Sequence, residues 1–132
     1  MIKLIAPLRD SDSYGFGHFG ASRGTRKHNG VDHACIPNSQ ILSPVKGKVT
    51  KLGYPYSDDL SFRYVQITTK EGYHVRVFYI EPSVSEGDQV NEDDIIGTSQ
   101  ELGKRYPAIT EHIHLEVKGA NGKFINPEDI GL

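Results

Sequence analysis

Two short segments carry histidine and aspartate side chains at spacings that suit a metal ion. In the first, His-Asn-Gly-Val-Asp, His28 and Asp32 are four residues apart, so in an extended segment both side chains point to the same face. In the second, Ile113 separates His112 from His114, so the two imidazoles share one face of a strand. Two imidazoles, a carboxylate and an open fourth position are the usual surroundings of a catalytic zinc ion.

Each of these patterns also has an explanation without a metal. A histidine four residues before an aspartate is a common spacing, and an isolated His-x-His strand is often a partly exposed pair. Spacing therefore leaves two alternatives, a zinc site or two unrelated polar segments, because the segments are far apart in the sequence. The same ligand types could also hold other divalent metals in vitro.

Short apolar runs between turn signals predict the strands that would position these residues. Several runs alternate between apolar and polar residues at period two, which favours strands over helices. In the fourth run, Val75, Val77 and Tyr79 are expected on one face. The expected strands are Gln40–Val45, Gly47–Leu52, Tyr64–Thr68, His74–Ile80, Ile95–Gly97 and Ile113–Val117.

We therefore expect a mainly β protein, a single small antiparallel domain spanning residues 1–132. Pairs of glycine with a polar residue predict tight turns between the runs. These turns are Glu71-Gly72, Glu86-Gly87-Asp88 and Asn121-Gly122. Helix is confined to a turn or two near Pro127–Ile130 and Glu101–Arg105. The glycine-rich segment 10–30 has no apolar pattern, and is either a disordered arm or an ordered functional loop.

Composition excludes several classes of partner. The 132 residues carry a formal net charge of −2 and no basic block, so neither nucleic acid nor a membrane surface is expected. Cys35 is the only cysteine, so no internal disulfide is possible. The first ten residues are too short and too polar for a secretory signal, and no stretch reaches transmembrane length. The chain is expected to be soluble and made in the cytoplasm.

The order of the motifs resembles that of the lysostaphin-type zinc endopeptidases. That family runs from H-x-G-x-D through a strand of the type P-V-x-A-x-x-G-x-V and a G-D-x-V-x-x-G-x-x-I-G segment to a final H-x-H-x-E. In this chain the elements are His28–Asp32, Pro37–Val49, Glu86–Val90 followed by Asp94–Gly97, His112–Glu116 and a closing Asn126–Pro127. The resemblance covers residues 16–130. It implies a β domain with a groove on one face and zinc at the floor of that groove.

The resemblance also implies a role for individual residues. His28, Asp32 and His114 would hold one zinc ion, and His112 would be the general base. The peptidases carry a Tyr-x-His-Leu motif whose histidine assists catalysis, and Tyr79 occupies that position here. The chemotaxin-2-like branch of the family has the same change and is regarded as a group of binding proteins. A phenol is nevertheless a hydrogen-bond donor that stays protonated at neutral pH, so Tyr79 is assigned as the second catalytic residue.

Four further residues have a structural and a functional interpretation. His33 alternates with Asp32 and is expected to face away from the metal. Glu116 shares a face with His114, and either contacts the site or forms a surface salt bridge. Tyr106 and Pro107, just before the His-x-His strand, are expected to shape the wall of the groove.

Two functions follow from these implications. The first is a zinc-dependent endopeptidase that hydrolyses peptide bonds of bacterial peptidoglycan, a cell-wall lytic enzyme of the kind phages use, acting at the wall or outside the cell. The alternative is a zinc-binding module of low or no catalytic activity, similar to the chemotaxin-2-like branch, that acts by binding a partner. The scissile bond and the oligomeric state do not follow from the sequence.

Overall fold

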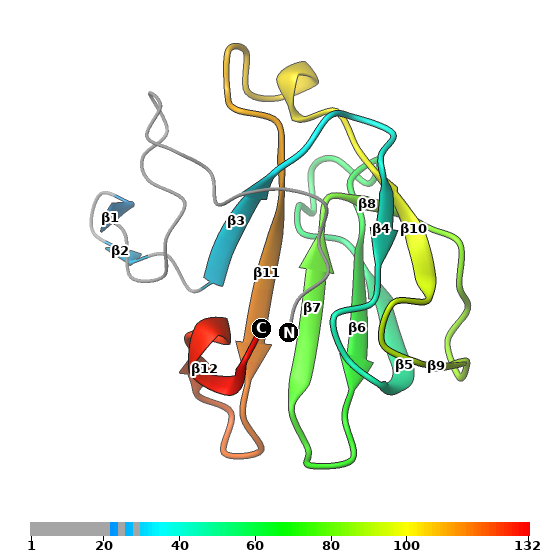
Figure 1. Cartoon of the computed structure of the whole chain (residues 1–132). Helices are drawn as coiled ribbons and strands as arrows, with labels where there is room; N and C mark the ends of the chain where they lie inside the picture. The colour runs from blue at the N-terminus through cyan, green and yellow to red at the C-terminus, as the bar shows by residue number, and fades with distance from the viewer. Residues whose placement is uncertain (1–21, 24–25, 28–29) are drawn as a thin grey trace.

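The computed structural model describes residues 22–23, 26–27 and 30–132, and it confirms the expected mainly β fold with antiparallel sheets (Figure 1). Every apolar run that was expected to form a strand contains one. The two short 3-10 helices, η1 and η2, lie where helix was expected. The elements outside the two main sheets are β1 (Ser22–Arg23), β2 (Arg26–Lys27), η1 (Leu102–Lys104) and η2 (Pro127–Ile130).

The larger sheet joins the two segments that carry the metal-ligand pattern. Neighbouring strands follow the order β12–β11–β7–β6–β5–β9, and β3 pairs with β11 along the same edge as β12. Its strands are β3 (Gly30–Ala34), β5 (Gly47–Gly53), β6 (Tyr64–Thr68), β7 (His74–Phe78), β9 (Gln89–Val90), β11 (His112–Lys118) and β12 (Phe124–Ile125). The antiparallel register of β3 and β11 places Asp32 directly opposite His114.

The smaller sheet contributes to a single core with one face of the larger sheet. It consists of β4 (Gln40–Leu42), β10 (Ile95–Ser99) and β8 (Ile80–Pro82) in the order β4–β10–β8. Ile41, Ile80 and Ile96 from this sheet cluster with Leu115 and Val77 from the larger one, and all are almost completely buried. Alternate residues of the larger sheet therefore point into the core, as period-two alternation requires.

The other residues of the larger sheet form rows across its opposite face. One row is His114, Phe78, Tyr64 and Gly53, and the next is Glu116, Arg76, Gln66 and Lys51. Residues in one row are directly paired between neighbouring strands, so their side chains lie side by side. Because Asp32 is paired with His114, the first row continues onto β3.

The expected strand His74–Ile80 is wrong at one position. Strand β7 ends at Phe78, and Ile80 opens β8 in the smaller sheet. Tyr79 between them has a φ of 71°, which a non-glycine residue rarely adopts and which breaks the alternation. As a result Tyr79 does not join Val75 and Val77 in the core, and its ring lies against Phe78 and His112.

The predicted turns are confirmed at their glycines. Gly72, Gly87 and Gly122 have φ values of 90°, 95° and 78°, the left-handed conformation that such turns require. The described residues contain no helix with the length and apolar character needed to cross a membrane.

Candidate functional site

Asp32 and His114 form the centre of the candidate site. The Asp32 Oδ1 atom lies 2.8 Å from Nδ1 of His114, and both side chains are largely withdrawn from solvent, with exposed fractions of 2% and 12%. The sheet register dictates this contact, because the two residues are paired across β3 and β11. Of the three predicted zinc ligands, the structure thus brings together Asp32 and His114, while His28 lies outside the described residues.

A close approach of the backbone at Gly30 makes room for the imidazole of His114. A Cβ atom at Gly30 would lie 2.1 Å from the carbonyl oxygen of Leu115 and 2.9 Å from Cε1 of His114. Only glycine fits such a contact without a shift of the neighbouring strand. The glycine in the His-x-Gly-x-Asp motif therefore has a packing role next to the site.

A second carboxylate orients His114 from its other nitrogen. Glu116 Oε1 lies 3.2 Å from Nε2 of His114, and the Glu116 side chain is only 13% exposed. Of the two interpretations of Glu116, contact with the site is confirmed. Burial opposes a charge on His114, but the Asp32 and Glu116 carboxylates outweigh this effect and raise the pKa of its imidazole to about 9.

This environment calls for a positive charge between Asp32 and His114. A neutral imidazole carries one N–H and can donate to only one of the two carboxylates. If Nε2 donates to Glu116, then Nδ1 presents a lone pair to Asp32, and a cation between Nδ1 and Oδ1 satisfies both atoms. A carboxylate on the far nitrogen is the usual support of a metal-binding histidine. These residues fit a zinc ion, although no group of three His, Cys, Asp or Glu side chains gathers in a metal-binding arrangement within the described part of the chain.

His112 lies next to this pair, with one of its nitrogens already engaged. Its Nδ1 is 2.7 Å from the carbonyl oxygen of Thr110, so Nδ1 carries the proton and donates. Nε2 is then the basic nitrogen, and it lies 3.6 Å from Oδ2 of Asp32. The backbone carbonyl therefore selects the tautomer that a general base at this position needs.

Tyr79 lies beside His112, close to the ligand pair that Asp32 and His114 form. The two rings meet edge to face with centroids 5.7 Å apart. Burial, together with the charge of Asp32 and despite a hydrogen bond from Tyr56, raises the pKa of the Tyr79 phenol to about 12. The phenol therefore stays protonated across the neutral range and can only act as a hydrogen-bond donor or a neutral acceptor there.

Loop contacts hold the backbone of Tyr79 in its unusual conformation. The N–H of Tyr79 donates to the carbonyl of Arg63 at 2.8 Å, and its own carbonyl accepts from the N–H of Gln100 at 2.8 Å. Gln100 also contacts this loop through its side chain, which accepts from Arg63 N–H at 3.0 Å and donates to the Ser61 carbonyl at 2.6 Å. These bonds offset the strain of a positive φ, which costs on the order of 1–2 kcal/mol for a residue with a side chain.

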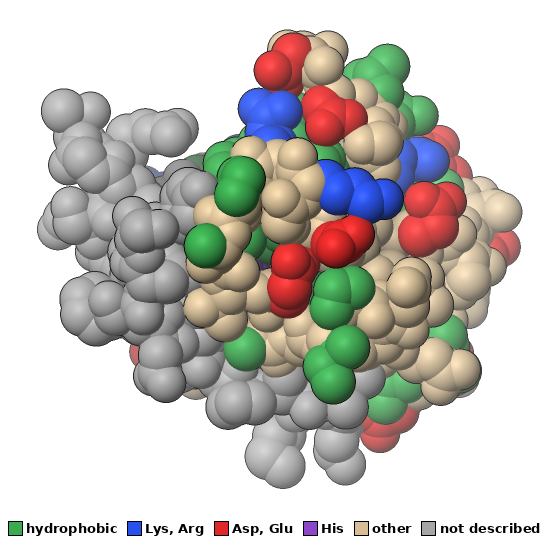
Figure 2. Space-filling model, turned by 90° about the horizontal axis from the view of Figure 1, so that it is seen from above, with side chains coloured by type: hydrophobic (Ala, Val, Ile, Leu, Met, Phe, Trp, Pro, Cys, Tyr) green, Lys and Arg blue, Asp and Glu red, His purple; other side chains and the backbone are tan. Residues whose placement is uncertain are grey.

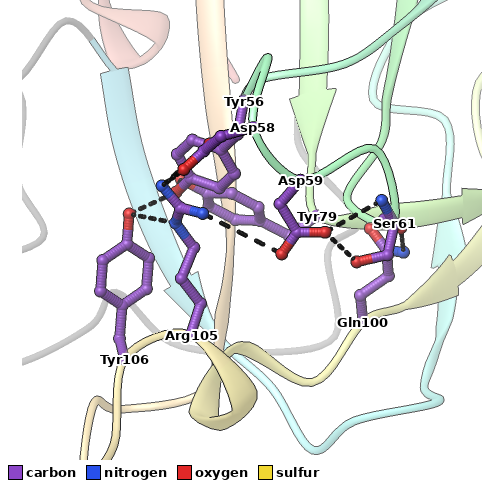
Figure 3. Close-up of polar contacts among 8 residues, drawn as sticks. All are labelled: Tyr56, Asp58, Asp59, Ser61, Tyr79, Gln100, Arg105 and Tyr106. Carbon is purple, nitrogen blue, oxygen red and sulfur yellow. Dashed lines mark hydrogen bonds and ion pairs between the residues drawn. The ribbon is translucent and has the colours of Figure 1, made fainter.

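A chain of phenols runs from Tyr79 to the surface (Figure 3). The Tyr79 and Tyr56 hydroxyl oxygens are 3.0 Å apart, and those of Tyr56 and Tyr106 are 2.8 Å apart. Arg105 lies at the outer end, with its Nε 3.3 Å from the Tyr106 hydroxyl and its Cζ 3.8 Å from the centre of the Tyr56 ring. Asp58 pairs with the guanidinium of Arg105 at 3.4 Å.

The guanidinium gives this chain a direction. Arginine has only donors, so the Tyr106 oxygen accepts from Arg105 and Tyr106 donates its own hydrogen to Tyr56. The hydrogen of Tyr56 is then available for Tyr79, the neighbour on its other side. When Tyr56 donates it, the hydrogen of Tyr79 points away from the chain, and Tyr79 can act as a donor on the side of His112.

Sequence reasoning located part of this arrangement. It assigned Asp32, His112, His114 and Tyr79, but it missed Tyr56 and Arg105, which lie in loops without periodicity. For Tyr56, the sequence signal is an aromatic residue in a loop, where no apolar side chain is needed for the core. Arg105 has no such signal. Figure 2, which looks down on the end of the molecule that bears η1, shows acidic and basic side chains interspersed over this region.

Comparison with known proteins agrees with the resemblance. Residues 26–127 match Peptidase family M23. The chain is 34% identical to leukocyte cell-derived chemotaxin-2 of Mus musculus over 109 residues, 83% of this chain and 72% of that protein. The solved structure of LytU superposes with a TM-score of 0.73 at 25% identity, covering 95% and 83% of the two chains. The antimicrobial peptidase lysostaphin from Staphylococcus simulans gives 0.72 at 18% identity, covering 96% and 50%. The chain therefore belongs to peptidase family M23.

Proposed function

We propose that this protein is a zinc-dependent endopeptidase that hydrolyses peptide bonds of bacterial peptidoglycan, acting at the cell wall or outside the cell. Membership of a peptidase family supports the reaction class. The observation that carries the proposal is the placement of Asp32 Oδ1 2.8 Å from His114 Nδ1, with Glu116 on the other nitrogen of the same imidazole. A buried imidazole between two carboxylates needs a positive charge, which a divalent cation at Nδ1 can supply in place of a second proton.

Asp32 and His114 would supply two ligands to the zinc ion and His28 the third. When bound, zinc lowers the pKa of a water molecule and polarises the substrate carbonyl. His112 would accept the proton of the attacking water at Nε2, because Thr110 already fixes the proton on Nδ1.

Tyr79 would donate a hydrogen bond to the oxygen on which negative charge develops. The phenol chain supports this role, because Tyr106 donates to Tyr56 and the hydrogen of Tyr56 is then available for Tyr79, which leaves the hydrogen of Tyr79 for the substrate. A preorganised donor at such a position accelerates acyl transfer by about 10²–10³-fold. Tyr79 cannot carry a positive charge, so a histidine at this position would act differently.

The second candidate is a zinc-binding module with little or no catalytic activity. Two observations favour it, the 34% identity to chemotaxin-2 and the phenol in the position where the resemblance expects a histidine. In that case Tyr79 would lie over the metal and restrict access of water. Both candidates require zinc, so metal content alone does not separate them.

Peptidoglycan hydrolysis by purified variants of matched zinc content tests the proposal. Release of muropeptides from walls with different crosslinks is measured for the wild type, for His112→Ala and for Tyr79→Phe. We expect His112→Ala to lose about 10²–10⁴-fold in rate, the usual contribution of a general base, with zinc retained. His74→Ala is the matched control, because His74 is at the far end of β7, where it contacts Thr68.

Substituting Tyr79→His separates the two candidates further. Histidine tolerates a positive φ better than most residues, so the variant should fold. If the phenol is a competent donor, Tyr79→His changes the rate by less than about tenfold. Zinc-loaded wild type that releases no fragment from any wall, together with a large gain in Tyr79→His, would instead establish the binding module.

A further inference from the structure

A row of polar side chains crosses the larger sheet next to the candidate site. Arg76, Gln66 and Lys51 are paired directly across β7, β6 and β5, and we call these three residues the basic strip. The row continues to Glu116 on β11, which contacts His114. The strip is therefore separated from His114 only by Glu116, which is paired with Arg76 on the neighbouring strand.

Arg76 is held in place but keeps most of its donors. Its Nε donates to Oε1 of Gln66 at 2.7 Å, and Nε2 of Gln66 donates to Oγ1 of Thr50 at 3.0 Å. Over the described ranges, no carboxylate forms an ion pair with Arg76 or with Lys51, although the chain as a whole is slightly acidic. The two terminal nitrogens of the Arg76 guanidinium thus remain available to an anionic group.

Both cations of the strip lie over one aromatic ring. Arg76 Cζ is 5.0 Å and Lys51 Nζ is 6.0 Å from the centre of the Tyr64 ring. That ring is buried, packs on Phe78 at 4.8 Å and covers Gly53, where a Cβ atom would come within 2.2 Å of it. Because the buried ring cannot move, its contacts with Arg76 and Lys51 restrict where the two positive charges lie.

We propose that the basic strip binds a carboxylate of the peptide substrate, so that the protein prefers acidic peptides to the same peptides with an amide at that position. This inference rests on the proposed function, because the peptide that binds the strip is taken to be the substrate of the endopeptidase. A guanidinium that is preoriented by Gln66 matches a carboxylate with two parallel hydrogen bonds, and Lys51 adds a point charge.

The sheet spacing gives the distance between this carboxylate and the reacting bond. Arg76 is one strand and two residues away from His114, which is about 5 Å across and about 7 Å along the strand. Lys51 is two strands further, about 10 Å. An extended peptide advances about 3.4 Å per residue, so the carboxylate would lie about three to five residues from the scissile bond.

A short acidic peptide fits this strip better than a long polyanion. The strip is a single row of three side chains, flanked on one side by the apolar Tyr64–Phe78 pair. Polyanion sites need cations spread along the whole contact, and the net charge of −2 disfavours such binding. The position beside the ligand pair also favours a ligand that reaches the site.

A titration of the zinc-loaded protein by ¹H–¹⁵N NMR tests this inference. The probes are acetylated, amidated pentapeptides of glycine and alanine that carry one glutamate, or one glutamine, at successive positions. We expect the glutamate peptides to bind about fivefold more tightly at the best position, with the largest shifts on β5–β7. The preference should disappear in Arg76→Gln, persist in part in Arg76→Lys and be unchanged in Lys123→Gln, an exposed control.

Several results would overturn it. Equal binding of glutamate and glutamine peptides to the wild type is one, and a preference that survives Arg76→Gln in a folded variant is another. An equal loss in Arg76→Gln and Lys123→Gln would indicate diffuse attraction. If the wild type cleaves no wall but prefers glutamate peptides, the proposed function fails and the strip stands. If the wild type hydrolyses walls but binds glutamate and glutamine peptides equally, the proposed function stands and the proposal for the strip fails.

Discussion

The two sides of the candidate site are held by different kinds of structure. On one side, Asp32 and His114 are directly paired residues of neighbouring strands, and a shift of their register would require the sheet to come apart. On the other side, Tyr79 lies between two strands in a left-handed conformation, and backbone hydrogen bonds to Arg63 and Gln100 hold it. The ligand side thus depends on the fold as a whole, whereas the phenol side depends on a few local hydrogen bonds.

This difference suggests which functions each side can vary. Substitutions on the ligand side disturb a buried charge balance and the sheet that supports it, so they should alter metal binding and stability together. Substitutions along the phenol chain remove single neutral hydrogen bonds, worth about 0.5–1.5 kcal/mol each. A change of activity without a change of metal content should therefore arise most readily on the phenol side.

The largest expected effect is on the ligand side and appears when the metal is removed. In the chelated protein, the pKa of His114 is raised from 6.5 to about 9, so the folded state holds this proton more tightly than the unfolded chain does. The resulting stability is fully present below pH 6.5 and is lost as the pH rises to about 9, a decrease of about 3 kcal/mol.

Thermal unfolding between pH 6 and pH 10, with and without zinc, measures this effect. The melting temperature of the chelated protein should fall through that window, whereas zinc-loaded protein should show no such fall because the cation replaces the proton. A flat profile for the chelated protein would contradict the assignment of His114 between two carboxylates.

The second prediction uses the close contact at Gly30. We expect Gly30→Ala to cost about 1–3 kcal/mol of stability, the usual effect of an added methyl group in a packed site, and to lower zinc affinity by displacing His114. Gly47→Ala is the matched control, since a Cβ atom there would lie 2.4 Å from the carbonyl oxygen of Thr68, away from the site. Denaturant unfolding and chelator competition measure both properties. An equal loss of zinc affinity in both variants would show a general effect of stability.

The third prediction concerns the support of His114. Glu116→Gln should weaken zinc binding by about 10–100-fold, because the neutral amide no longer stabilises the ligand from its far nitrogen. Chelator competition measures the zinc dissociation constant, and Glu128→Gln, on η2, is the control. An unchanged zinc affinity in Glu116→Gln would show that the contact between Glu116 and His114 does not support metal binding.

The same difference between the two sides explains how much could be predicted from the sequence. Alternation in β11 correctly placed Ile113 and Leu115 in the core and His112 and His114 on the other face. His33 was predicted to face away from the metal, and this is confirmed, because His33 is paired with Ile113, which points into the core. Regular strands transmit such patterns over their whole length, so the ligand side was predictable.

The phenol side was not predictable, for two physical reasons. The alternation continues through Tyr79 to Ile80 without a glycine or asparagine, so nothing in the local sequence indicates a positive φ there. The conformation comes from hydrogen bonds to Arg63 and Gln100, which are distant in the chain. Loop partners such as Tyr56 likewise follow no period.

The smallest predicted effect is at the outer end of the phenol chain. Tyr106→Phe removes the hydrogen that Tyr106 donates to Tyr56, so Tyr56 can accept from Tyr79 instead of donating to it. In that reversed arrangement, the hydrogen of Tyr79 no longer points toward the substrate side. We expect the hydrolysis rate to fall by about two- to tenfold, the value of one neutral hydrogen bond, with KM and zinc content unchanged. Tyr54→Phe is the control, because Tyr54 is exposed and its ring contacts Arg63 rather than the phenol chain. A Tyr106→Phe variant as active as the wild type, in a protein where Tyr79→Phe is impaired, would mean that Tyr79 is oriented by its own backbone alone.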